Sequence, residues 1–165
     1  LVTPEALAFF KSTGIFSEEE VHARYHVQLE RYIKDCEIEI EALKGMVQTQ
    51  IFPAAYEQQE LLAESISKLI TVLKLSPDAE PAKAQLAQLN SCAQAIGELQ
   101  SRLATLNSVV ATLEHSDELA DKATILATKV LPAMVDVREV CDELEDVVAD
   151  HFWPLPKYRE MLFIS

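Results

Sequence analysis

The stretch LAQLNSCAQAIGELQSRLATLNSVVATL, residues 86–113, decides the fold. Its apolar side chains recur every three or four residues without interruption, which is the period of one face of an α-helix. Pro81 precedes the stretch and suits the first turn of a helix, where its missing N–H would have no intrahelical partner anyway. The stretch therefore predicts a long helix over about residues 82–114.

A second amphipathic pattern follows directly. Residues 114–117 read as a tight turn, in which Ser116 is expected to cap the next helix. Apolar residues then repeat with the same period as far as Val148, which predicts a helix over about residues 117–150. Pro132 falls in its middle, and we expect a kink there because proline lacks the backbone donor and clashes with the preceding turn.

A third helix is predicted N-terminal to this pair, over about residues 18–75. Ser17 and Glu20 have the spacing of a capping box, and an apolar stripe follows them with helical period. Pro53 interrupts the stripe and predicts a kink, or a complete break that would give four helices instead of three.

The two ends of the chain differ from this pattern. Thr3, Pro4 and Glu5 favour the start of a short helix over about residues 4–12, and Gly14 favours its end. The last segment, 151–165, holds the only Trp and two closely spaced prolines, which exclude a regular helix. Such an aromatic tail is expected to dock against protein and not to lie free in water.

Together these patterns predict an all-α protein. It is a bundle of three long antiparallel helices, two of them kinked at proline, with a short N-terminal helix and an irregular aromatic C-terminal tail. The expected divisions are residues 1–16 (short helix and linker), 17–150 (bundle) and 151–165 (tail). Helix lengths place Pro132 level with about residue 57, so the two kinks should stand side by side and the bundle should bend as a unit.

In this layout residues 18–41 extend beyond their partners although they continue the apolar stripe. This stripe and the tail supply the candidate interface residues, which are Tyr25, Leu29, Tyr32, Trp153, Tyr158, Leu162 and Phe163. Their cover would be the short first helix, the tail, a part of a longer protein or another subunit. If it is another subunit, the isolated chain should form a dimer or larger species at micromolar concentration. Packing of the tail over its own bundle is an equal alternative.

Composition excludes several classes of function. Among 165 residues, 14 are Lys or Arg and 27 are Asp or Glu, and the net charge of −13 repels nucleic acid and anionic membranes. Three glycines cannot build a Gly-rich phosphate loop. Three scattered cysteines indicate a reducing, cytoplasmic setting, and no apolar run approaches the ~20 residues of a membrane span. The chain begins with Leu1, which suggests a piece of a longer protein.

We assign no catalytic, cofactor-binding or metal-binding residue. Glu19 and His22 have the Glu-x-x-His spacing of carboxylate-bridged metal bundles, but such a site needs a second motif and further carboxylates. The acidic residues between 139 and 150 are expected to be a solvated helix face. Cys36 and Cys141 lie on apolar stripes and are expected to pack in the core.

Four segments, in order along the chain, carry a family resemblance. They are GIFSEEEVHARY at 14–25, IFPA at 51–54, VLPAM at 130–134, and DELE at 142–145 followed by WPLPKY at 153–158 and LF at 162–163. This series resembles the C-terminal region of type III glutamine synthetases, from the segment after the catalytic domain to the closing motif. The chain departs from the family pattern at Val21, Ala23, His26, Lys157, Arg159 and Glu160.

The resemblance implies a non-catalytic structural and assembly domain of a cytoplasmic glutamate–ammonia ligase. The parent enzyme would join ammonia to glutamate with ATP and Mg²⁺, which its catalytic domain would bind upstream of the segments quoted. The implied partners are that catalytic domain and neighbouring subunits of a homo-oligomer. Two other readings stay open: a freestanding helical-bundle interaction module, and a metal-dependent bundle enzyme with a single ligand motif.

Overall fold

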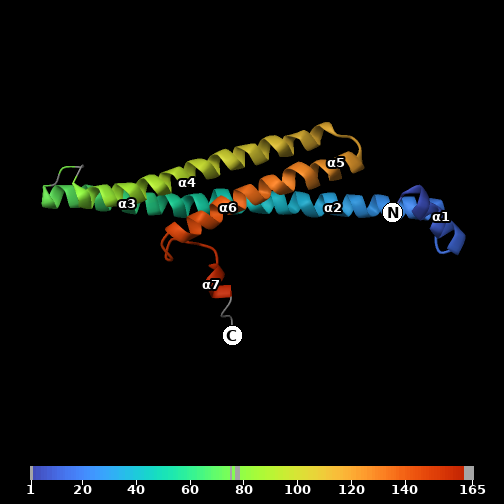
Figure 1. Cartoon of the computed structure of the whole chain (residues 1–165), viewed down its shortest axis with the longest axis horizontal. Coiled ribbons are helices and arrows are strands. Elements are labelled where there is room, and N and C mark those ends of the chain that lie inside the picture. The colour runs from blue at the N-terminus through green and yellow to red at the C-terminus, as the bar shows by residue number, and fades with distance from the viewer. Residues whose placement is uncertain (1, 75, 77–78, 162–165) are drawn as a thin grey trace.

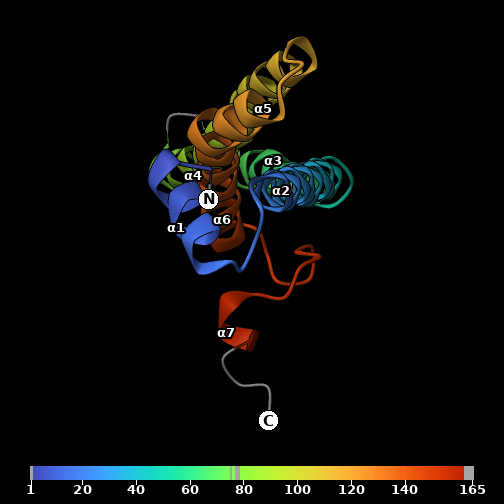
Figure 2. The same cartoon turned by 90° about the vertical axis from the view of Figure 1, so that its right-hand side faces the viewer.

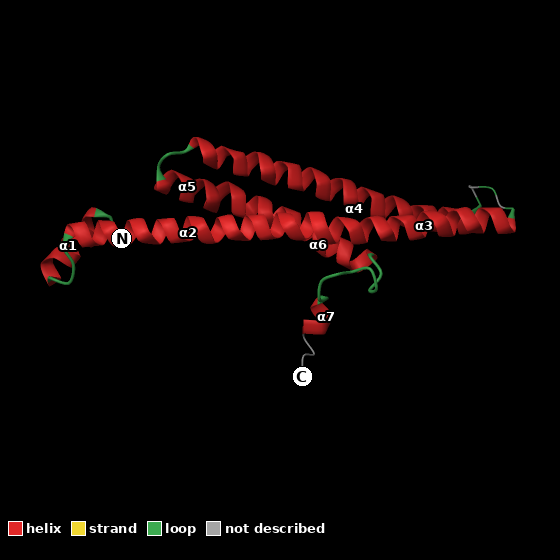
Figure 3. Ribbon diagram, turned by 180° about the vertical axis from the view of Figure 1, so that it is seen from behind, coloured by secondary structure: helices red, strands yellow, loops and turns green. Residues whose placement is uncertain are grey.

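The computed structural model describes residues 2–74, 76 and 79–161. These residues form helices and connecting loops without any strand, so the predicted all-α class is confirmed (Figure 3).

Local capping chemistry begins the first two helices where the sequence predicted. Helix α1 spans Pro4–Thr13, and the Thr3 hydroxyl accepts a hydrogen bond from the amide of Ala6. Gly14 ends it with φ 67°, a left-handed conformation that costs glycine little. Helix α2 spans Glu18–Met46 and opens with both bonds of a capping box: Ser17 N to Glu20 Oε2 at 2.8 Å, and Glu20 N to Ser17 Oγ at 3.2 Å.

Helix α2 continues without a non-helical residue into a π-helical turn, η1, at Val47–Ile51 and then into α3 at Phe52–Leu73. Helix α3 ends at Lys74, whose φ of 50° is left-handed. We call this unit the α2–α3 rod. The π turn lies directly before Pro53, where the sequence predicted a kink or a break. The wider turn keeps the backbone helical there, and α2, η1 and α3 follow one another without a loop between them.

The return path begins with α4, Glu80–Ala111, which ends in a 3₁₀ turn, η2, at Thr112–His115. The α5–α6 rod follows: α5 at Leu119–Ile125, a π-helical turn η3 at Leu126–Val130, and α6 at Leu131–Val147. The N-cap position of α5 is Glu118 and has no side-chain cap bond, so the expectation that Ser116 caps this helix was wrong. A short helix α7, Tyr158–Met161, lies in the predicted irregular tail.

The molecule is long and narrow (Figure 1). Helices α3 and α4 pair as a hairpin at one end, whereas α1 folds back beside the start of α2 at the other. The α5–α6 rod lies along the middle, with α5 packed on α2 and α6 packed on α4. Seen end-on, α4 and α5 diverge from α2 toward one side (Figure 2).

The register of the rods differs from the predicted layout. The thiol of Cys92 lies 3.9 Å from the carbonyl oxygen of Ala55, which sets α4 about ten residues closer to the start of α2 than expected. Gln58 contacts Ala149 across a sequence separation of 91, which places Pro132 level with about residue 41. The two prolines are therefore about 18 Å apart along the axis, and the expected side-by-side arrangement was wrong.

The core lies where the α2–α3 rod, α4 and the α5–α6 rod overlap. Its most deeply buried side chains come from all three, and they include Ile40, Val47, Leu99, Leu106, Leu126, Val130, Val137 and Leu144. All three cysteines are buried and free, and for Cys36 and Cys141 this agrees with the prediction from their place on the apolar stripes.

Candidate interface

The apolar stripe of α2 changes in burial along its length. Cys36 and Ile40 are buried in the core, whereas Tyr25, Leu29 and Tyr32 are only partly covered. At the start of α2, on which the short helix α1 packs, Val21 is 1% exposed. The predicted uncovered stripe is thus reduced to the stretch between residues 25 and 32, where the chain's own helices leave apolar surface incompletely buried.

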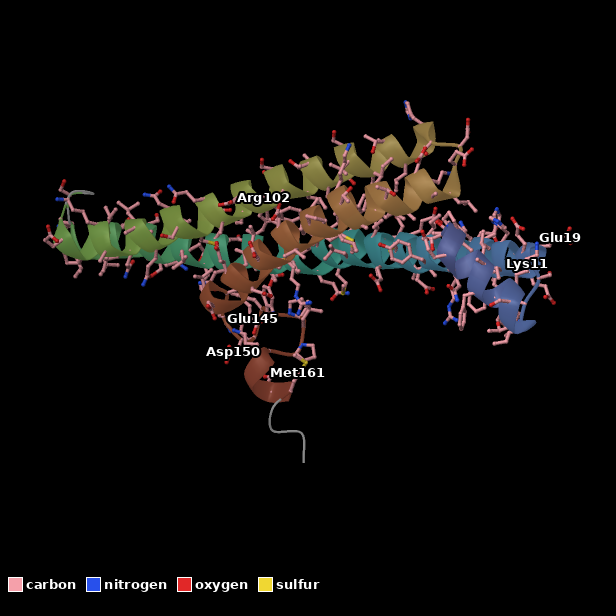
Figure 4. The ribbon with its side chains drawn as sticks, turned by 45° about the vertical axis from the view of Figure 1, so that its right-hand side comes forward. Lys11, Glu19, Arg102, Glu145, Asp150 and Met161 are labelled. Carbon is pink, nitrogen blue, oxygen red and sulfur yellow. The ribbon has the colours of Figure 1, made fainter. Side chains whose placement is uncertain are left out.

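Polar and aromatic contacts fix the corner between α1 and α2. The Arg24 guanidinium lies 4.4 Å from the centre of the Phe16 ring, a cation–π contact that ties the linker to α2. Lys11 and Glu19 project from this corner (Figure 4), and with His22 they line a shallow depression. The corner is therefore a packed joint with a polar outer surface.

The C-terminal end of α6 is tied down by Lys157. Its ammonium group donates to the carbonyl oxygens of Glu145, at 2.9 Å, and Val148, at 3.3 Å. It also forms an ion pair with Asp150 at 2.8 Å, and its side chain is only 12% exposed. Positive charge at a helix C-terminus is favoured by the helix dipole and satisfies carbonyls that have no intrahelical partner. Glu145 and Asp150 lie where the tail leaves α6 (Figure 4).

The residues just after α6 pack against the chain itself. Trp153 is 8% exposed and belongs to the core cluster, with Phe152 and Leu155 packed beside it. Gln58, a buried polar residue on α3, accepts a hydrogen bond from the amide of Ala149 at 3.1 Å. Of the two alternatives for the tail, packing over its own bundle therefore holds as far as Trp153.

The remaining predicted interface residues are not placed by these contacts. The side chain of Tyr158, and Leu162 and Phe163 as a whole, lie outside the described residues. The structure thus brings Tyr25, Leu29 and Tyr32 together on one helix and separates Trp153 from them at the end of α6.

Sequence reasoning missed the roles of Lys157 and Gln58. For Gln58 a signal existed, because it occupies an apolar-stripe position after Ile51 and Ala54. Lys157 lies ten residues beyond Val147, the last residue of α6, and no sequence pattern indicated its contacts. Lys157 is also one of the positions at which the chain departs from the family pattern.

The thiols are placed for packing and not for reaction. Burial, and secondarily the negative charge of Asp142, raises the pKa of Cys141 to about 11. Burial also raises the pKa of Cys36 and of Cys92. A thiolate nucleophile needs the opposite shift, and these residues offer none.

No group of three or more His, Cys, Asp or Glu side chains within residues 2–74, 76 and 79–161 is arranged to hold a metal ion. Over the same residues, no helix has both the length and the apolar character needed to cross a bilayer.

Comparison with known proteins matches this helical chain to one enzyme family. The family described as "Glutamine synthetase C-terminal domain" matches residues 1–70, which hold α1, α2, η1 and most of α3. Type-3 glutamine synthetase of Dictyostelium discoideum is 29% identical over 171 residues, covering 98% of this chain. The predicted resemblance is confirmed. The chain is thus similar to a type-3 glutamine synthetase over nearly its whole length, and to glutamine synthetase C-terminal domains over residues 1–70.

Two bacterial relatives agree with this assignment. Glutamine synthetases of Bacteroides fragilis and Butyrivibrio fibrisolvens are 29% and 28% identical, covering 90% and 98% of this chain. The chain spans 23%, 20% and 23% of the length of the three relatives. The chain therefore corresponds to about a fifth of the length of each of these relatives.

Proposed function

We propose that this chain is a non-catalytic structural and assembly domain of a type-3 glutamine synthetase. The observation that carries the proposal is the extent of the matches: they cover nearly all of this chain but about a fifth of each relative. The whole enzyme would join ammonia to glutamate with ATP and Mg²⁺, and the residues for that chemistry would lie in its catalytic domain. This chain would act as an elongated bundle of three long antiparallel helices.

Tyr25, Leu29 and Tyr32 support an assembly role. They lie on one face of α2, they are incompletely covered by the chain's own helices, and a partner would bury them further. We propose that this patch contacts the catalytic domain or a neighbouring subunit of a cytoplasmic homo-oligomer. The three reduced, buried thiols fit a cytoplasmic setting.

A phosphate-release assay tests the non-catalytic part of the proposal. The isolated chain, mixed with glutamate, ammonia and Mg²⁺-ATP, should release no phosphate above the buffer rate. Steady release that requires all three substrates would overturn it. The control is a full-length enzyme containing this chain, which should release phosphate under the same conditions.

Light scattering on the isolated chain tests the assembly part. At micromolar concentration the wild-type chain should form a dimer or a larger species, because the side chains of Tyr25, Leu29 and Tyr32 are only partly covered. The variant Leu29→Ser/Tyr32→Ser should shift toward monomer, whereas Val27→Ser/Ile38→Ser, changed at exposed apolar positions of the same helix, should not. A wild-type chain that stays monomeric at 100-fold higher concentration would remove the patch as an interface between copies.

A further inference from the structure

Two nine-residue segments of this chain follow one pattern. Residues 47–55 read VQTQIFPAA and residues 126–134 read LATKVLPAM. Both have Thr third, Pro seventh and Ala eighth, with apolar residues at the first, fifth and sixth positions. Both fold in the same way: five residues of π helix, then an α-helix whose second residue is the proline.

The backbone bonding of the two segments also matches. The amide of Phe52 donates to the carbonyl of Val47, and the amide of Leu131 donates to that of Leu126, five residues back in each case. An ordinary α-turn at these points would press the proline ring against the carbonyl four residues before it. The wider π turn relieves that clash, which explains why the helices continue through both prolines.

The threonines of the two segments make equivalent bonds. The Thr49 hydroxyl donates to the carbonyl of Gly45, and the Thr128 hydroxyl donates to that of Thr124, both at 2.7 Å. Other threonines of the chain bond in the same way, so this feature accompanies the π turn and does not cause it.

The burial pattern repeats as well. Four equivalent positions are buried in both: Val47, Ile51, Ala54 and Gln58 in one rod, and Leu126, Val130, Ala133 and Val137 in the other. Ala55 is buried as well, whereas its counterpart Met134 is only partly buried. The steps between the four equivalent positions are four, three and four residues in both rods. In an unbroken α-helix such positions lie on one face and would meet one neighbour. The one extra residue in a π turn instead rotates everything that follows by about 100°.

The packing partners change at these turns. Helix α2, before the first turn, packs on α5, whereas α3, after it, packs on α4. Helix α5, before the second turn, packs on α2, whereas α6, after it, packs on α4. Each rod therefore packs mainly on the other rod before its π turn and mainly on α4 after it (Figure 1). After their π turns the two rods still touch where Gln58 of α3 accepts from the amide of Ala149, just after α6.

We propose that residues 47–55 and 126–134 are two copies of one joint, and that its extra residue turns the apolar stripe from one partner helix to another. Without the π turn, each rod would be a continuous α-helix, and its whole apolar stripe would face a single neighbouring helix. The proline disfavours this alternative. The joints are staggered, since Pro53 lies level with about residue 144 and Pro132 with about residue 41. Each joint thus lies beside an unbroken α-helical stretch of the other rod, which opposes bending there.

Single-residue deletions test whether the extra residue of each π turn sets the orientation of the helix that follows it. In a Pro132→Ala background, one variant lacks Lys129, inside the π turn, and its matched control lacks Glu139, in α6. Both residues are exposed in the intact chain. Deleting Lys129 should convert the turn to α-helix and leave α6 facing α4. Deleting Glu139 should rotate the residues after it by about 100°.

Iodoacetamide labelling of Cys141, followed by mass spectrometry of its peptide, reports the orientation of α6 because this thiol is buried against its neighbours. The Lys129 deletion should label within about threefold of the Pro132→Ala parent. The Glu139 deletion should label at least about a hundredfold faster. Equal acceleration in both deletions, failure of the Lys129 deletion to fold, or no acceleration in either would overturn the proposal.

The first joint offers an independent repeat of the test. In a Pro53→Ala background, deletion of Gln48 from the π turn is compared with deletion of Glu57 from α3, with Cys92 of α4 as the labelled thiol. Cys92 should stay protected in the Gln48 deletion and become reactive in the Glu57 deletion. The opposite order of reactivity would show that the two segments are not copies of one joint.

Discussion

Apolar side chains are covered to different degrees at the C-terminal end of α6 and at the start of α2. At the end of α6, Trp153 is buried, Lys157 closes the helix, and Gln58 binds the backbone that follows. At the start of α2, Tyr25 and Leu29 stay partly exposed although the helix itself is well capped. The comparison teaches that the described part of the chain covers the apolar surface at the end of α6, whereas it leaves the stripe of α2 between residues 25 and 32 partly exposed.

The largest expected effect contrasts the core of α6 with the stripe of α2. Leu144→Ala, at a fully buried position, should lower the free energy of unfolding by about 2–5 kcal/mol, because it leaves a cavity. Leu29→Ala, at a half-buried position, should lower it by no more than about 1 kcal/mol. Urea unfolding followed by circular dichroism measures both. Equal losses would show that the two regions are equally packed.

The next effect concerns the closure of α6. Lys157→Met should lower the free energy of unfolding by about 1–3 kcal/mol, because two carbonyls and Asp150 lose a charged partner. Lys34→Met, which removes an exposed ion pair with Glu37, is the control and should cost less than about 0.5 kcal/mol. If Lys157→Met lowers the free energy of unfolding no more than the control does, the side chain of Lys157 does not hold the tail in place.

A smaller effect is expected at the first turn of α2. Ser17→Ala removes the oxygen that accepts from the amide of Glu20 and should cost about 1 kcal/mol. The change should appear in hydrogen exchange as faster exchange of the first-turn amides, with the core of α6 unaffected. Uniformly faster exchange along the whole chain would mean that the start of α2 is as strongly coupled to the core as α6 is.

The smallest effect is a pH dependence from the same cap. The hydrogen bond from the backbone N–H of Ser17, followed by that from its side chain, lowers the pKa of Glu20 below 4.5. Since the folded-state pKa is the lower one, the stabilisation is complete above about pH 4.5 and is lost as the pH falls through the folded value. Stability measured from pH 6 to pH 3 should therefore fall less steeply in Glu20→Gln than in wild type. Parallel curves would contradict this contribution.

The features that could be predicted from the sequence are those that depend on local chemistry. Helix starts at Thr3 and Ser17, the stop at Gly14 and the burial of the cysteines all depend on residues close in sequence or on one helical stripe. The predicted cap at Ser116 failed because the 3₁₀ turn Thr112–His115 carries the chain further before α5 begins.

Longer-range features could not be predicted in the same way. A proline inside a helix indicates a disturbed turn, but whether the backbone kinks, breaks or widens depends on the neighbours that hold both halves. The register of α4 against Ala55, and of Ala149 against Gln58, is set by interdigitating side chains and not by loop length. The contacts of Lys157 depend on the path of the tail, which period and composition do not encode.

The most direct test of the assembly role is sedimentation velocity on a full-length enzyme that contains this chain. The variant Leu29→Asp/Tyr32→Asp is compared with Val27→Asp/Ile38→Asp, which places the same charges on exposed positions of α2, after circular dichroism has shown equal helix content. The first variant should sediment as smaller species, while the second keeps the wild-type coefficient. Wild-type sedimentation of both variants would contradict an assembly role for this face of α2.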